Sequence, residues 1–170
     1  TKIIVTDHRH GELKLISYRG AMNPQKAREL IGMLRGDTPA RLDLDTLRKL
    51  MRNVYKRLKL LENFNRVEVP AEGKVTVVGD IHGQLEDLLL ILEDAGEPSE
   101  NNLFIFNGDF VDRGANSCEV ISILFALYAA FPGRVYLNPG THQPPPIRPQ
   151  YGSPAELVPP HASATLFLFG

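Results

Sequence analysis

Residues able to bind a metal ion or a phosphate gather at the ends of three short apolar runs between Val75 and His142. Asp80, His82 and Asp109 offer carboxylate and imidazole groups, a set that suits Mn, Fe or Zn better than Ca, which prefers oxygen ligands alone. Arg113 adds a planar guanidinium that matches phosphate oxygens. The three clusters are Gly79-Asp80-Ile81-His82-Gly83, Gly108-Asp109-Phe110-Val111-Asp112-Arg113-Gly114 and Gly140-Thr141-His142.

The apolar runs before these clusters predict the strands of a parallel sheet. Val75–Val78, Leu103–Phe106 and Val135–Leu137 are rich in Val, Ile, Leu and Phe, and helical patterns separate them. Strands that alternate with helices indicate βαβ units and an α/β fold. Because ligands gather outside the carboxyl ends of such strands, we expect the three clusters to converge there.

The helical pattern after each cluster carries its own start and stop signals. The first predicted helix places its leucines, beginning at Leu85, at helical spacing and ends at Gly96. Asn116 and Glu119 have the spacing of a capping box before a second, apolar helix, on which we expect Cys118 to lie in the core.

The first two clusters resemble the first two signature motifs of the phosphoprotein phosphatase family, the metal-dependent serine/threonine protein phosphatases among the calcineurin-like metallophosphoesterases. The resemblance covers roughly Leu44 to His142. It implies the N-terminal half of a metallophosphoesterase fold, which is a β-sandwich flanked by helices. In this chain N-terminal helices precede that half, and a Pro-rich irregular tail follows it.

The activity implied by the resemblance is hydrolysis of phosphoserine and phosphothreonine by a water molecule that bridges two divalent ions. By the same resemblance, Asp80 and His82 hold the first ion and Asp109 bridges both ions. Arg113 would bind the phosphate. We expect at most one ion, of Mn, Fe or Zn, to be well held by this chain.

The third cluster departs from the family pattern. The resemblance makes His142 the proton donor to the leaving oxygen, and Asp112 the carboxylate that orients His142. Pro139, Thr141 and Gln143, however, replace an arginine, a metal-binding asparagine and a glutamate of the family motif. The segment is Asn138-Pro139-Gly140-Thr141-His142-Gln143.

Three interpretations therefore stay open. The first is a serine/threonine phosphatase that is weak or inactive as this chain, including a truncated or out-of-frame product. The second is a non-catalytic, phosphatase-like remnant that serves as a binding or regulatory module. The third is another calcineurin-like phosphoesterase, for instance one that cleaves dinucleoside polyphosphates.

The N-terminal residues predict a hairpin and a helix. Ile3–Val5 and Leu13–Ile16 flank a turn, Asp7–Gly11, whose Asp7, His8 and His10 are expected to be solvated rather than metal-binding. A helix begins at Pro24, after Asn23 as its cap, and Gly36 closes it. The predicted organisation is an N-terminal extension over residues 1–40, a partial catalytic domain over 41–143 and a Pro-rich, disordered tail over 144–170.

A strongly basic amphipathic helix is predicted from about Asp43 to Leu61. Its apolar positions keep helical period, and Lys and Arg fill most of the other positions. Residues 46–61 could therefore bind a calmodulin-like or other regulatory protein. The alternative is a solvated face on a helix that packs against the phosphatase-like domain.

Composition indicates a globular intracellular protein. A net charge of -1 over 170 residues provides no field for nucleic acid. The single Cys118 excludes an internal disulfide, and the chain begins with no signal-peptide pattern. We expect no transmembrane segment, because Val120–Phe131 is too short to span a bilayer. The expected location is cytoplasmic or nuclear.

Overall fold

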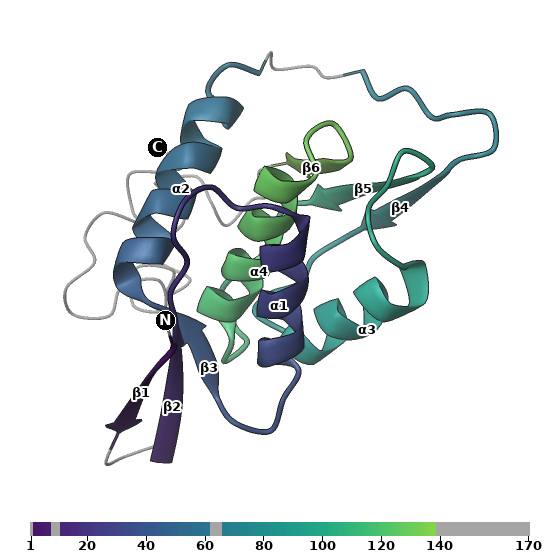
Figure 1. Cartoon of the computed structure of the whole chain (residues 1–170). Helices are drawn as coiled ribbons and strands as arrows, with labels where there is room; N and C mark the ends of the chain where they lie inside the picture. The colour runs from purple at the N-terminus through teal and green to yellow at the C-terminus, as the bar shows by residue number, and fades with distance from the viewer. Residues whose placement is uncertain (1, 8–10, 62–65, 139–170) are drawn as a thin grey trace.

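The computed structural model describes residues 2–7, 11–61 and 66–138, which form ten helices and strands (Figure 1). In chain order these are β1 (Lys2–Asp7), β2 (Gly11–Ile16), α1 (Pro24–Leu34), β3 (Ala40–Leu42), α2 (Leu44–Leu58), β4 (Lys74–Val78), α3 (Leu85–Ala95), β5 (Asn102–Asn107), α4 (Ser117–Ala130) and β6 (Val135–Asn138).

The three strands predicted between Val75 and Leu137 form one parallel sheet, in the order β4-β5-β6. Helix α3 connects β4 to β5, and α4 connects β5 to β6, so the expected βαβ units and the α/β class are confirmed. Gly96 ends α3 as predicted, because its φ of +79° suits glycine and its N–H donates to the carbonyl of Leu92.

Helix α4 is the centre of the helical layer. Figure 1 shows α1, α2 and α3 arranged around it, and each of them contacts it. Of the 14 residues in α4, 12 are buried, so this helix is covered on every side. None of the helices in the described part of the chain is long and apolar enough to cross a membrane.

The two faces of the β4-β5-β6 sheet differ in cover. Phe104 and Phe106 are fully buried on one face, where their rings stack with centroids 5.9 Å apart. On the other face, Val77 pairs with Ile105 and Ile105 with Tyr136. Val77 is 67% exposed, and its two neighbours are only partly buried. This second face is thus apolar and partly open among the described residues.

The N-terminal hairpin is present as predicted, and a third strand joins it. Strands β1 and β2 pair antiparallel, and β3 pairs parallel with β2. Strand β3 was not predicted, because three residues are too few to show a strand pattern. Its burial alternates, with Ala40 and Leu42 buried and Arg41 exposed between them, as a half-covered strand requires. Part of the predicted turn, residues 8–10, lies outside the described residues.

Helix α2 begins as predicted but ends earlier. Asp43 caps it by accepting hydrogen bonds from the backbone N–H groups of Asp45 and Thr46. The helix ends at Leu58, whereas the apolar period predicted an end near Leu61. Leu61 is 46% exposed, so its side chain is outside the stripe that packs on α4. The apolar residues keep helical spacing as far as Leu61, but the helix ends where its contact with α4 ends.

Candidate metal and phosphate site

Two loops lie at the carboxyl ends of adjacent strands, and we call them the metal loops. The first, Gly79–Gly83, follows β4, and the second, Gly108–Gly114, follows β5. Backbone hydrogen bonds join them: the N–H groups of Ile81 and His82 both donate to the carbonyl of Asp109, at 3.0 and 2.9 Å. The predicted convergence of the first two clusters is therefore present, and the third cluster lies outside the described residues.

Four non-glycine residues of the metal loops adopt left-handed backbone angles. The φ values are +48° for His82, +43° for Asp109, +67° for Asp112 and +71° for Arg113. Such a conformation costs roughly 1–2 kcal/mol per residue and persists only where the surroundings enforce it. Among described residues, every non-glycine with positive φ is one of the candidate site residues. Strain concentrated in this way is typical of ligand-binding and catalytic loops.

Two glycines allow the metal loops to meet. A Cβ at Gly114 would lie 2.3 Å from the carbonyl oxygen of His82, and a Cβ at Gly83 would lie 2.8 Å from that of Gly114. Both obstacles are backbone atoms, which cannot rotate away. Gly79 differs, because a Cβ there would meet nothing within 4 Å. The close approach therefore depends on Gly83 and Gly114.

The side chains of Asp80, His82 and Asp109 form a possible metal site. One ligand atom from each lies within 4.8 Å of the others, and Nε2 of His82 is 3.6 Å from Oδ2 of Asp80. Ligands on opposite sides of a Zn-sized ion are about 4.2 Å apart, because each bond is about 2.1 Å long. The distance of 3.6 Å is within this value and the limit of 4.8 Å is about 0.6 Å beyond it, so these residues fit one divalent ion after at most a small side-chain movement.

The imidazole of His82 is oriented for metal binding. Its Nδ1 lies 2.9 Å from the carbonyl oxygen of Val111. A carbonyl can only accept a hydrogen bond, so Nδ1 carries the proton and the lone pair is on Nε2, the nitrogen that faces Asp80. A backbone acceptor behind a histidine is the usual means by which proteins orient a metal ligand.

The remaining predicted site residues have contrasting environments. Asp112 is fully buried, and Arg113 beside it is exposed. Arg113 lies in the same loop as Asp109, and its exposure makes it accessible to a phosphate from solvent. His142, the predicted proton donor, lies outside the described residues.

The start of α4 differs from the prediction. Asn116 and Glu119 do not form a capping box: the side chain of Asn116 makes no capping hydrogen bond, and its N–H donates to the carbonyl of Gly83 at 3.1 Å. The carboxylate of Glu119 binds the guanidinium of Arg41 on β3 instead. Partial burial lowers the pKa of Arg41, but the charge of Glu119, its hydrogen bond and the nearby Cys118 together outweigh burial, so the pKa is raised overall. Cys118, expected in the core, is only partly buried.

These contacts at the start of α4 were not predictable from a local pattern. Arg41 and Glu119 are 78 residues apart in sequence, and Arg41 is on β3, which was not predicted. Ser117, which is buried against Gly83, has no motif of its own. Only the fold brings these residues to the metal loops.

A family model described as calcineurin-like phosphoesterase matches residues 73–166. This range begins just before β4 and includes both metal loops. It extends further toward the C-terminus than the stretch Leu44–His142, in which the motif resemblance was seen.

Curated relatives are serine/threonine protein phosphatases. The chain is 42% identical over 123 residues to serine/threonine-protein phosphatase rdgC of Drosophila melanogaster, which covers 72% of this chain and 19% of that protein. It is 43% identical over 103 residues to serine/threonine-protein phosphatase with EF-hands 1 of Mus musculus, which covers 61% of this chain and 16% of that protein. The chain thus spans less than a fifth of the length of these two relatives.

A solved structure with a similar fold is a serine/threonine phosphatase from Saccharomyces cerevisiae, titled as similar to human phosphatase PP5. The TM-score is 0.69 at 25% sequence identity, and the match covers 84% of this chain and 47% of that one. The α/β arrangement of parallel strands and flanking helices therefore corresponds to part of a known phosphatase structure.

Proposed function

Because the chain belongs to the calcineurin-like phosphoesterase family and is homologous over part of its length to serine/threonine protein phosphatases, we propose that it carries the first part of a metal-dependent phosphatase site. The substrate class would be phosphoserine and phosphothreonine in proteins. The observation that carries this proposal is the orientation of His82, whose Nδ1–H bonds to Val111 and whose Nε2 faces the Asp80 carboxylate.

Each candidate residue has a role that matches its environment. Asp80, His82 and Asp109 would hold the metal, because their ligand atoms already lie within 4.8 Å of one another. A bound divalent ion would supply Lewis acidity and lower the pKa of a bound water. Arg113, which is exposed and lies in the same loop as Asp109, would bind the phosphate through its planar fork.

Asp112 would act as a positioning carboxylate. Its complete burial keeps it from solvent and suits a group that orients a neighbouring histidine rather than one that contacts substrate. By resemblance this histidine is His142, which would give its proton to the leaving oxygen.

We further propose that the β4-β5-β6 sheet is one half of a β-sandwich. The partly open apolar face around Val77, which is 67% exposed, would be covered by a second sheet in a complete domain. The match to only 47% of the yeast phosphatase structure agrees with this proposal.

This chain alone is expected to have low activity or none. The third motif carries Pro139, Thr141 and Gln143 where the family has an arginine, a metal-binding asparagine and a glutamate. Without that asparagine, the second ion would lack a ligand, and a water bridging two ions would not be activated. A non-catalytic, phosphatase-like module that binds one ion is therefore the second candidate. Because the sequence has a single cysteine and so no internal disulfide, we propose a cytoplasmic or nuclear location.

Helix α2 is the proposed surface for a regulatory partner, with one restriction. Its apolar residues Leu50, Met51 and Val54 are buried, and the helix packs on α4. A calmodulin-like protein that grips an apolar helix face would have to detach α2 first. A partner that binds only the outward basic face, which includes Arg52 and Lys56, would not.

Calorimetric titration of the chain with Mn²⁺, combined with a phosphopeptide hydrolysis assay, tests the proposal. We expect one bound ion per chain and slow or undetectable phosphate release. Asp80→Asn should weaken Mn²⁺ binding by about 10-fold or more, because the amide lacks the ligand charge. Asp94→Asn is the matched control, since Asp94 is exposed on α3, away from the metal loops.

The possible results select between the candidates. A phosphatase is supported if the chain binds one ion, if Asp80→Asn weakens this binding, and if phosphate release depends on Mn²⁺. One bound ion without phosphate release supports the non-catalytic module. If no ion binds, or if Asp80→Asn and Asp94→Asn behave alike, the proposed metal site is wrong.

A further inference from the structure

We infer that Arg41 is a positioning residue for the proposed metal site: its ion pair with Glu119 holds the first turn of α4 and, through that turn, the two metal loops. This inference rests on the proposed function. It would give the N-terminal sheet, which contributes β3, a direct influence on the geometry of the metal ligands.

The first step concerns the burial of Glu119. Its side chain is only 6% exposed, and a buried carboxylate is costly unless a charge or hydrogen-bond donors compensate it. Within the described part of the chain, the hydrogen bond to this side chain comes from Nε of Arg41 to Oε1, and Oε2 is buried without a hydrogen-bond partner. The cost of burying the Glu119 carboxylate is therefore offset by its ion pair with Arg41.

The second step is that the start of α4 contacts the first metal loop, and the first metal loop contacts the second. The N–H of Asn116 donates to the carbonyl of Gly83 at 3.1 Å, and the N–H of Gly114 donates to that of His82 at 2.8 Å. The hydroxyl of Ser117 lies 2.8 Å from the point where a Cβ at Gly83 would be. A displacement of this turn would therefore move both loops, because no free space separates them.

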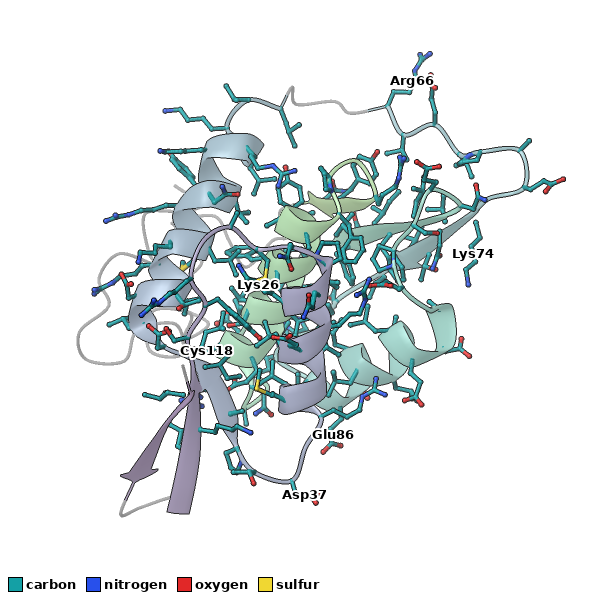
Figure 2. The ribbon with its side chains drawn as sticks, viewed as in Figure 1. Lys26, Asp37, Arg66, Lys74, Glu86 and Cys118 are labelled. Carbon is teal, nitrogen blue, oxygen red and sulfur yellow. The ribbon has the colours of Figure 1, made fainter. Side chains whose placement is uncertain are left out.

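The third step is that the ion pair can be broken. Arg41 is 51% exposed and, together with Glu119, lines a cavity of about 680 Å³. This cavity is also lined by Asp37 and Glu86, which lie at the edge of the molecule where the loop after α1 faces the start of α3 (Figure 2). The strand that carries Arg41 has three residues and pairs with β2 alone in its sheet. The side chain of Arg41 can therefore change conformation into this cavity while Ala40 and Leu42 stay buried.

Figure 1 places β3 at the same end of the molecule as the start of α4, and the two elements are in contact. The influence of Arg41 is therefore expected to be local. It should reach the metal loops and leave the far ends of α2 and α4 unchanged.

Two measurements on the full chain test the inference. Arg41→Met should raise the Mn²⁺ dissociation constant by about 10-fold, the lower end of the effect of changing the residues that support metal ligands. It should also speed hydrogen exchange of the metal-loop amides while exchange in β5 and the centre of α4 stays slow. Arg28→Met is the matched control, because Arg28 forms an exposed ion pair with Glu97 at 2.6 Å.

Two further variants keep the test decisive. Arg41→Lys keeps the charge but loses the planar fork, so it should partly restore Mn²⁺ affinity and loop protection. If Arg41→Met does not fold, Glu119→Gln can be compared with the unaltered chain instead. Glutamine keeps the size of the side chain and its hydrogen-bond acceptor but removes the buried charge. The expected result for Glu119→Gln is faster exchange confined to the metal loops.

The exchange measurement separates the inference from the proposed function. If the unaltered chain binds no Mn²⁺, the proposed metal site fails, and the exchange pattern still tests the coupling. Faster exchange confined to the loops supports the inference. Unchanged loop exchange, or an increase spread evenly over β4-β5-β6, overturns it, because the pair would then be dispensable or merely stabilising.

Discussion

The starts of α2 and α4 are built in opposite ways. Helix α2 is capped by its own sequence, since Asp43 accepts hydrogen bonds from the N–H groups of Asp45 and Thr46. Helix α4 has no side-chain cap. The carbonyl of Gly83 accepts from Asn116 there, and Glu119 bonds to Arg41. The first start is encoded locally, and the second exists only when distant segments have assembled.

Helix α2 is mostly exposed, whereas helix α4 is mostly buried. Only 4 of the 15 residues of α2 are buried, whereas 12 of the 14 residues of α4 are. A helix that lies partly in water needs its own cap to define where it begins. The start of α4 is fixed by its surroundings, which are also the metal loops. Damage near α4 should therefore reach the site, and damage near α2 should remain local.

The largest expected effect is that of Gly114→Ala. The new Cβ would lie 2.3 Å from the carbonyl oxygen of His82 and 2.7 Å from the carbonyl carbon of Gly83, so the loops would have to separate. We expect a loss of about 4 kcal/mol or more in the free energy of unfolding, the range typical of severe steric damage. Urea denaturation followed by circular dichroism measures it.

Gly79→Ala is the control for this prediction. A Cβ at Gly79 meets nothing within 4 Å, and its φ is not in the left-handed region. The same substitution there should change stability by less than about 1 kcal/mol. Equal losses at both glycines would show that the start of α4 does not depend on the contact between the metal loops.

The next largest effect is expected in the body of α4. Leu124 is fully buried, so Leu124→Ala should destabilise the fold by about 2–5 kcal/mol through lost burial and the cavity left behind. Leu90→Ala on α3 is the matched control, because Leu90 is 66% exposed and its truncation should cost less than about 0.5 kcal/mol. A small loss at Leu124 would mean that α4 is not the centre of the core.

Most of the fold was predictable because its signals are local. Strand runs, the leucine spacing of α3 and the cap at Asn23 each depend on neighbouring residues, and all three were found in the structure. The three-residue β3 was missed because its pairing with β2 stabilises it more than its own sequence does. The early end of α2 was missed for a similar reason, since the surface of α4 determines where α2 stops packing.

The site was predictable to the extent that its motifs are continuous. Asp80, His82 and Asp109 were selected by their positions at strand ends, and the structure brings them within 4.8 Å. The left-handed backbone of Asp112 and Arg113 was not foreseen, because residue type alone does not reveal strain. The ion pair between Glu119 and Arg41 was not predicted. Glu119 has the spacing of a capping box with Asn116, but its actual partner is Arg41.

The smallest expected effect belongs to the start of α2. Asp43→Ala removes a local cap and should cost about 1 kcal/mol without altering Mn²⁺ binding, because the capping hydrogen bonds of Asp43 go to Asp45 and Thr46 of α2 itself. Asp43→Asn should cost less, since asparagine is also a good cap. Urea denaturation and calorimetry on the same samples measure the two quantities. Weaker Mn²⁺ binding in Asp43→Ala would contradict the proposed separation of the two helix starts.

The stabilisation by the Asp43 cap at the start of α2 is expected to depend on pH. Burial raises the pKa of Asp43, but hydrogen bonds from Thr46, Ser17 and the N–H of Asp45 outweigh it, so the pKa in the folded chain is lowered. Since the folded pKa is below the unfolded value of about 3.9, the stabilisation is fully present above that pH. It is lost as the pH falls through the folded pKa. The unaltered chain should therefore be more stable than Asp43→Asn at pH 7 and pH 5, and this difference should shrink below about pH 4. A difference that does not depend on pH would show that the charge of Asp43 does not contribute.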